Sequence, residues 1–137
     1  MMSAIVLSMR LQSIDLPDMN DFLQLARESR NAAEFLYLQG ERSRPVAFCY
    51  VHSAELLLKG WLQQQGLLSE SLRKTHDLQV LWDSQLATSA NDRELIEILS
   101  PIDPKTTRFR YPSTNLGDWN LEEIRRVVLA LHQIADE

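Results

Sequence analysis

The 137 residues fit a single domain, long enough for a hydrophobic core without disulfides or structural metals. Hydrophobic residues make up 45% of the chain and charged residues 24%, as in ordinary globular proteins. The net charge of −5 argues against non-specific DNA binding, which requires a basic surface, so any contact with nucleic acid is expected to be local. A single cysteine, Cys49, excludes an intrachain disulfide and a zinc site built from thiolates.

The apolar runs are too short for a membrane span. The run at residues 4–7 lacks a preceding basic region, and no other run approaches the roughly 20 residues that a bilayer requires. We therefore expect a soluble, cytoplasmic protein that does not associate with membranes. Residues 1–15 are expected to form a mobile N-terminal arm, and residues 16–137 the folded domain.

Two long helices are expected in the first half of the chain. The first spans about residues 18–39, because apolar and small side chains recur there every three or four positions. Asp18 is its expected N-cap and Gly40 its stop. The second runs from Arg44 to Gly66 with a continuous apolar stripe, and we expect it to be the central helix of a bundle.

Three further helices are expected in the second half. A polar link at residues 69–74 leads to a helix capped by Thr75, whose apolar stripe ends at Leu86. A brief helix is capped by Asn91, and the last helix starts near Asn120. Residues 100–118 show no periodicity, which is typical of a functional or mobile loop. Together these elements predict an all-α fold, an antiparallel up-down four-helix bundle with one extra short helix.

Three short motifs follow one another along the chain. Glu55 to Lys59 form a Glu-x-x-x-Lys pattern in an alanine- and leucine-rich helix, Lys74 to Leu78 form a Lys-x-His-Asp-Leu turn, and Arg110 to Pro112 precede the last helix. In order and spacing these motifs resemble the HEPN family, a nucleotide- and RNA-linked helical domain, over about residues 18–136. The resemblance implies a four- or five-helix bundle that forms homodimers. It also implies association with a nucleotide or RNA, often beside a nucleotidyltransferase-like partner in a toxin–antitoxin or defence pair.

Ribonucleases of the family carry an Arg followed, after four to six residues, by a His, usually with a polar residue after the Arg. Here the matching positions are Arg125 or Arg126 with His132, but Val127 stands where the polar residue is expected and the usual downstream Tyr is missing. A chance match on the flank of a helix is therefore favoured over a catalytic pair of Arg125 and His132. The resemblance then implies a member without an intact ribonuclease motif.

His76 and Lys59 are the ligand-contact candidates on helices. His76 lies at the start of a helix, where free backbone N–H groups favour an anion; the alternative is that its ring hydrogen-bonds a neighbouring helix. Lys59 shares a helical face with His52 and Glu55. The structural alternative there is a polar flank with a Glu55–Lys59 ion pair worth about 0.2–0.5 kcal/mol. One His, one Glu and one Lys do not make a metal site, so neither a metal nor a cofactor is expected.

Arg108, Arg110 and Tyr111, with Lys105 nearby, form a basic and aromatic cluster in the long loop. Arginine pairs with phosphate through two hydrogen bonds, and a tyrosine ring can stack on a base. The alternative is that this segment only anchors the loop to the bundle.

From these patterns we expect a binding and dimerisation module for a nucleotide or RNA. The alternatives are a metal-independent endoribonuclease acting as a dimer and a purely structural interaction scaffold. General acid–base cleavage by Arg125 and His132 would require both groups to lie within hydrogen-bond distance of the RNA.

Overall fold

The computed structural model describes residues 21–86, 90–100 and 120–136 of the chain. These residues form six helices and no strand, which confirms the predicted all-α fold. The expected N-terminal arm, residues 101–118 of the expected loop and Asp18 lie outside the described residues.

Helices α2 (Phe22–Leu38) and α3 (Arg44–Gln64) are the longest. Helix α2 begins four residues later than predicted, because the Asp21 side chain accepts a hydrogen bond from the backbone N of Gln24 at 3.1 Å and so caps the helix there. Gly40, with a φ of 94°, follows α2 and allows the chain to reverse into α3. The predicted boundaries of α3 agree with the structure within two residues.

Three of the sequence predictions for residues 69–86 are wrong. The segment expected as a polar link contains helix α4 (Glu70–Lys74), which is capped by the Ser69 hydroxyl. The cap of α5 (Leu78–Asp83) is Asp77 rather than Thr75, since the Asp77 carboxylate accepts from two backbone N–H groups of the first turn. The helix ends three residues before Leu86, whose side chain is 75% exposed instead of completing an apolar stripe.

The last two helices are α6 (Ala90–Leu99) and α7 (Leu121–Asp136). Helix α6 begins at Ala90, one residue before Asn91, the cap that the sequence indicated. The prediction for α7 is confirmed, because Oδ1 of Asn120 accepts from the backbone N of Glu123 at 3.1 Å.

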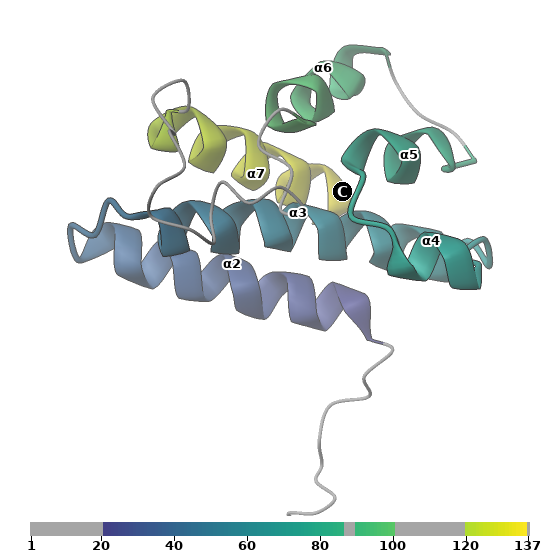
Figure 1. Ribbon diagram of the computed structural model, residues 1–137, viewed down its shortest axis with the longest axis horizontal. Coiled ribbons are helices and arrows are strands. Elements are labelled where there is room, and N and C mark those ends of the chain that lie inside the picture. Colours follow the sequence, from purple (N-terminus) through teal and green to yellow (C-terminus); the bar gives the residue numbers. More distant parts are fainter. Residues whose placement is uncertain (1–20, 87–89, 101–119, 137) are drawn as a thin grey trace, which may run out of the picture.

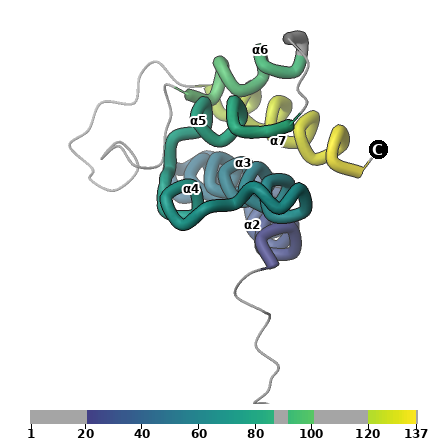
Figure 2. Tube along the Cα trace, turned by 90° about the vertical axis from the view of Figure 1, so that its right-hand side faces the viewer, coloured from purple at the N-terminus to yellow at the C-terminus, as the bar shows by residue number. Residues whose placement is uncertain are grey.

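The helices lie in two layers. Figure 1 shows α2 and α3 as an antiparallel pair below and α5, α6 and α7 above it, with α7 running in the same direction as α3. The end-on view of Figure 2 shows the same layers, and the link from α4 to α5 rises from the lower layer to the upper one. Helix α3 is central, as predicted, because it packs against α2, α5 and α7.

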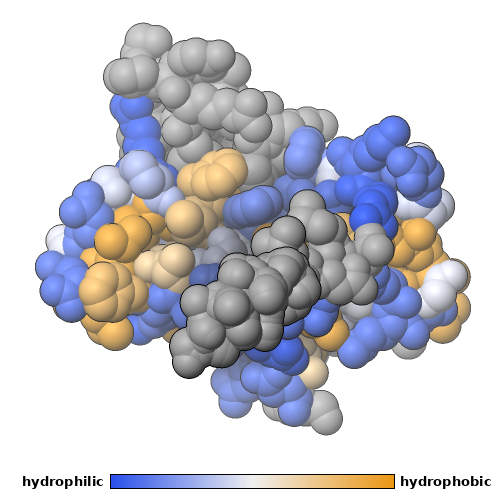
Figure 3. Space-filling view, turned by 90° about the horizontal axis from the view of Figure 1, so that it is seen from below, coloured by the Kyte–Doolittle hydropathy of each residue, from blue (hydrophilic) through white to orange (hydrophobic). Residues whose placement is uncertain are grey.

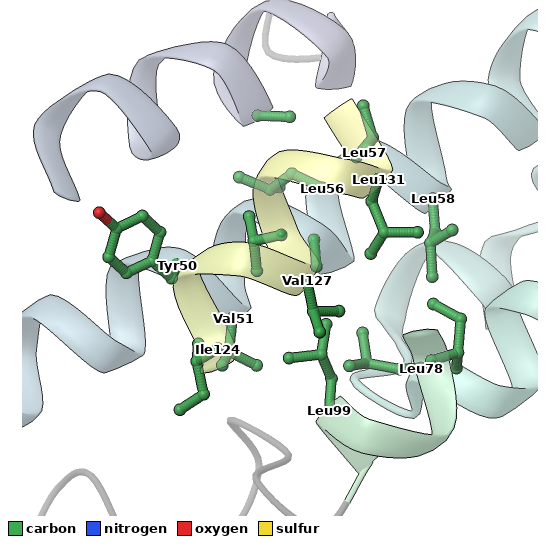
Figure 4. Close-up of a cluster of buried hydrophobic side chains, with 14 of the residues drawn as sticks. Tyr50, Val51, Leu56, Leu57, Leu58, Leu78, Leu99, Ile124, Val127 and Leu131 are labelled. Carbon is green, nitrogen blue, oxygen red and sulfur yellow. The ribbon is translucent and has the colours of Figure 1, made fainter. Parts of the chain in front are cut away.

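One hydrophobic core joins the layers, and α3 and α7 supply most of its side chains. In Figure 4 side chains of these two helices face one another, while Leu78 and Leu99 enter from α5 and α6. Burial of this apolar surface is the main stabilising contribution to such a bundle. In the described part of the chain no helix is both long enough and apolar enough to cross a membrane.

Candidate functional site

Glu55 is a buried carboxylate that binds two other side chains. Its side chain is 2% exposed, and its Oε2 accepts a hydrogen bond from Lys59 Nζ at 2.9 Å. Nδ1 of His76 lies 3.1 Å from Oε1 and 3.2 Å from Oε2 of the same carboxylate. Glu55 and Lys59 belong to α3, and His76 to the link that rises from α4 to α5 (Figure 1). We call these three residues the Glu55 cluster.

Exposure distinguishes the members of the Glu55 cluster. The side chain of Lys59 is 5% exposed and pairs with Glu55, whereas the side chain of His76 is 49% exposed. The predicted Glu55–Lys59 ion pair is therefore present, but it is buried and does not lie on a solvated flank. Burying two charges has a large desolvation penalty, so this pair is weak evidence for a stabilising role. Of the three side chains, His76 is the one that solvent or a ligand can reach.

The predicted anion site at the start of α5 is already filled. The Asp77 carboxylate accepts from the backbone N of Gln79 at 3.0 Å and of Val80 at 3.2 Å, and Thr75 Oγ1 accepts from the backbone N of Asp77. An external anion would meet both a carboxylate and occupied N–H groups. A ligand at this position would therefore contact the ring of His76 and not the backbone N–H groups of α5.

His52 lies one helical turn before Glu55, as the spacing predicted, and its ring stacks on Phe48 with centroids 5.4 Å apart. Burial lowers the pKa of His52, Glu55 acts in the opposite direction, and Lys59 and His76 lower it further. Among the described residues, no three His, Cys, Asp or Glu side chains come together as metal ligands would.

His132 is buried between three helices. Only 3% of it is exposed, and its Nε2 lies 2.6 Å from Oγ of Ser53 on α3. The Ser53 hydroxyl donates its proton to the carbonyl of Ala26 on α2 at 2.7 Å, so Nε2 of His132 carries a proton and donates to Ser53. Burial lowers the pKa of His132 to about 4, which keeps the ring neutral near pH 7.

Arg125 forms a bidentate ion pair with Glu34 of α2. Its Nε lies 2.7 Å from Oε2 and its Nη2 2.9 Å from Oε1 of Glu34, and its guanidinium lies 4.6 Å from the ring centre of Tyr37. Tyr50 also donates to Glu34 at 3.0 Å. The Arg125 hydrogen bond holds the pKa of Glu34 below its usual value, whereas burial raises the pKa of Tyr50.

Arg125 and His132 do not converge. Arg125 binds Glu34, while His132 reaches Ala26 through Ser53, eight residues earlier on α2 and about 12 Å along its axis. Both side chains are occupied by contacts between helices. Arg108, Arg110 and Tyr111 lie outside the described residues, so their predicted role in ligand binding stays a prediction.

Sequence reasoning missed two partners of the candidate residues, Ser53 and Glu34, and also Tyr50, which donates to Glu34. Ser53 and His132 are 79 positions apart, and Glu34 and Arg125 are 91 apart, so helical spacing within one element gave no signal for either contact. The sequence predicted only one of the two contacts of Glu55. Its spacing of four residues to Lys59 indicated the ion pair, but nothing local indicated that His76 shares the same carboxylate.

Comparison with protein families matched one family, described as the HEPN domain, over residues 19–137. Neither the curated proteins nor the solved structures gave a match. The family match covers most of the chain, and the two-layer helical bundle described above agrees with it. The chain therefore belongs to the HEPN domain family.

Proposed function

We propose that this HEPN domain binds a nucleotide or a nucleotide unit of RNA, and that His76 of the Glu55 cluster contacts the ligand. The observation that supports the proposal is a buried carboxylate that orients a half-exposed histidine. Binding sites commonly place a few preorganised polar groups within apolar surroundings. Here Lys59 binds Glu55, Glu55 orients the ring of His76, and the exposed part of the ring is free to contact a ligand.

Titration calorimetry with ATP, GTP and a short single-stranded RNA tests the proposal. The unmodified protein is expected to bind at least one of these probes, and His76→Ala is expected to weaken that binding roughly 10-fold or more. Lys74→Ala is the matched control, because this exposed residue lies two positions away and pairs with Glu70 on the surface. Absence of binding to all three probes by a folded protein would refute the proposal, as would equal losses in the two variants.

The endoribonuclease alternative has less support from the described residues. Its two candidate groups are Arg125, paired with Glu34, and His132, buried against Ser53. A general base must reach the substrate hydroxyl, and His132 is 3% exposed. An RNA-cleavage assay distinguishes the two functions: activity that His132→Gln abolishes without unfolding the protein would favour the ribonuclease.

The proposed module also forms a homodimer. Phe35 and Leu38 are 63% and 71% exposed and lie three positions apart on one face of α2. Figure 3 shows apolar side chains gathered at the end of the molecule where α2 ends. Exposed apolar pairs of this kind are typical of contact surfaces. Light scattering is expected to give the dimer mass for the unmodified protein and a lower mass for Phe35→Glu. Leu86→Glu, at another exposed leucine, is the control.

A nucleotidyltransferase-like partner, as in a toxin–antitoxin pair, is part of the same proposal. Its test is co-expression of this chain with the protein encoded next to it, followed by co-purification. Recovery of an unrelated type of protein, or of none, would limit the proposal to ligand binding and dimerisation.

A further inference from the structure

The contact with Glu55 determines which ring nitrogen of His76 carries a proton. An ionised carboxylate can only accept hydrogen bonds, and Nδ1 of His76 lies within 3.2 Å of both oxygens of Glu55. Nδ1 therefore carries the proton and donates it to Glu55. In a neutral ring, Nε2 then has a free lone pair and accepts a hydrogen bond.

The carboxylate of Glu55 already has a counter-charge beside it. Lys59 Nζ lies 2.9 Å from Oε2, and the side chains of both residues are buried. The test below is therefore set at a pH where an ordinary histidine ring is neutral.

Three described groups near His76, namely the start of α5, Lys59 and Lys74, do not offer a phosphate site. The N–H groups at the start of α5 are taken by the Asp77 carboxylate, which would repel an anion, and Lys59 is 5% exposed and held by Glu55. The exposed Lys74 pairs with Glu70 at 3.3 Å. A phosphate oxygen next to a lone pair on Nε2 would have no proton to accept.

We infer that His76 contacts its ligand through a neutral hydrogen-bond donor of the nucleoside, a ribose hydroxyl or a base amino group, and not through a phosphate. This inference rests on the proposed nucleotide-binding function and specifies the part of the ligand that the Glu55 cluster recognises. A site that hydrogen-bonds a hydroxyl or amino group discriminates against analogues without it, because a buried polar group then loses its partner.

Titration calorimetry at about pH 8, where an ordinary histidine is neutral, tests the inference with a series of ATP analogues. The analogues are 2′-deoxy-ATP, 3′-deoxy-ATP, ITP, which lacks the amino group of the base, and tripolyphosphate, which lacks the nucleoside. One of the first three is expected to bind the unmodified protein roughly 3- to 10-fold more weakly than ATP. In His76→Ala, ATP and that analogue are expected to bind equally.

The analogue that binds more weakly than ATP identifies the hydrogen-bond donor. A weaker deoxy analogue indicates a ribose hydroxyl, and weaker ITP indicates the base amino group. Equal weakening of ATP and tripolyphosphate by His76→Ala would overturn the inference but leave the proposed function standing. Equal affinities for ATP and all three nucleoside analogues would also overturn the inference and leave the proposed function standing. Failure of ATP, GTP and the short RNA to bind would refute both.

Nitrogen NMR of the histidine side chains gives a test that needs no ligand. The expected spectrum at about pH 8 shows His76 with its proton on Nδ1, whereas His132 has its proton on Nε2. A proton on Nε2 of His76 would overturn the inference whether or not a nucleotide binds. His76→Gln separates ring chemistry from side-chain bulk, and circular dichroism checks that each variant is folded.

Discussion

Helix α3 binds a histidine on each of two sides, and the two histidines are held in opposite ways. Toward α2 and α7, Ser53 contacts His132, which is 3% exposed and donates from Nε2. Toward α5, Glu55 contacts His76, whose side chain is 49% exposed and which donates from Nδ1. One ring has its polar contact in the core, and the other keeps Nε2 available.

The two sides also differ in how α3 approaches its neighbours. On the side of α2, small residues allow close contact: a Cβ built on Gly60 would lie 2.5 Å from Cδ2 of Leu23. On the side of α5, α3 buries the charges of Glu55 and Lys59 in addition to the apolar packing with Leu78, Leu81 and Trp82. Under the proposed function, both sides stabilise the fold, and the α5 side also positions His76 for its ligand.

The largest expected loss of stability follows from removing one of the two buried charges. Glu55→Gln leaves Lys59 buried without a counter-charge, and loss of one partner of a buried ion pair typically costs about 3–5 kcal/mol. Urea unfolding of the variant is therefore expected to show a large decrease in the free energy of unfolding, or no folded protein.

Glu55→Gln/Lys59→Met is the control for this prediction. The double variant removes both charges, and replacing a buried ion pair by uncharged groups is often close to neutral. It is expected to be clearly more stable than Glu55→Gln alone. A double variant that is as unstable as the single one would show that the side chains stabilise α3 by packing and not by their mutual charge.

The second prediction tests the close approach of α2 and α3. Gly60→Ala would place a Cβ 2.7 Å from Cγ and 3.0 Å from the backbone N of Leu23, so α2 itself has to shift. Overpacking of this kind is expected to lower the free energy of unfolding by about 3 kcal/mol. Thermal and urea unfolding measure the loss. Gly60→Ala/Leu23→Ala, which removes part of the clash, is expected to lose less than the sum of the two single changes.

Much of the fold was predictable because apolar periodicity and capping are local. The stripes of α2, α3 and α7 and the cap at Asn120 are set by neighbours within one helix, and the structure confirms them. Errors arose where two local signals competed. Both Thr75 and Asp77 are good caps, and only the geometry of the chain reversal decides that Asp77 bonds the first turn.

The candidate site was predictable only in part, for a physical reason. The spacing of Glu55 and Lys59 showed their ion pair, but their burial depends on helices far away in the sequence. His132 matched a sequence signature, yet its environment comes from Ser53 and Ala26 on two other helices. The sequence indicates which side chains could bind a ligand, and tertiary packing decides which histidine is exposed enough to do so.

The third prediction concerns the pH dependence of stability. Burial lowers the pKa of His132 to about 4 from an ordinary 6.5; Arg30 and Arg27 act in the same direction and Asp136 opposes them. The unfolded state therefore binds the proton first. The stability contributed by the neutral ring is complete above pH 6.5 and is lost as the pH falls toward 4.

Urea unfolding between pH 7 and pH 4 is expected to show roughly 2 kcal/mol of loss from this residue. His132→Gln, whose amide can still donate to Ser53, is expected to remove that part of the pH dependence while Asp and Glu residues continue to contribute theirs. The same slope in both proteins would mean that His132 does not titrate as a buried ring, and the contrast between the two histidines would then disappear.

The smallest expected effect on stability belongs to His76. Its ring is half-exposed and makes one hydrogen bond to Glu55, so His76→Ala is expected to lower the free energy of unfolding by about 0.5–1.5 kcal/mol. Lys59 keeps the carboxylate paired in this variant, which limits the cost of the lost contact. The same change is expected to remove most of the affinity for a nucleotide. A large loss of stability with unchanged binding would reverse the assignment, because the α5 side of α3 would then be structural and the histidine only one of its supports.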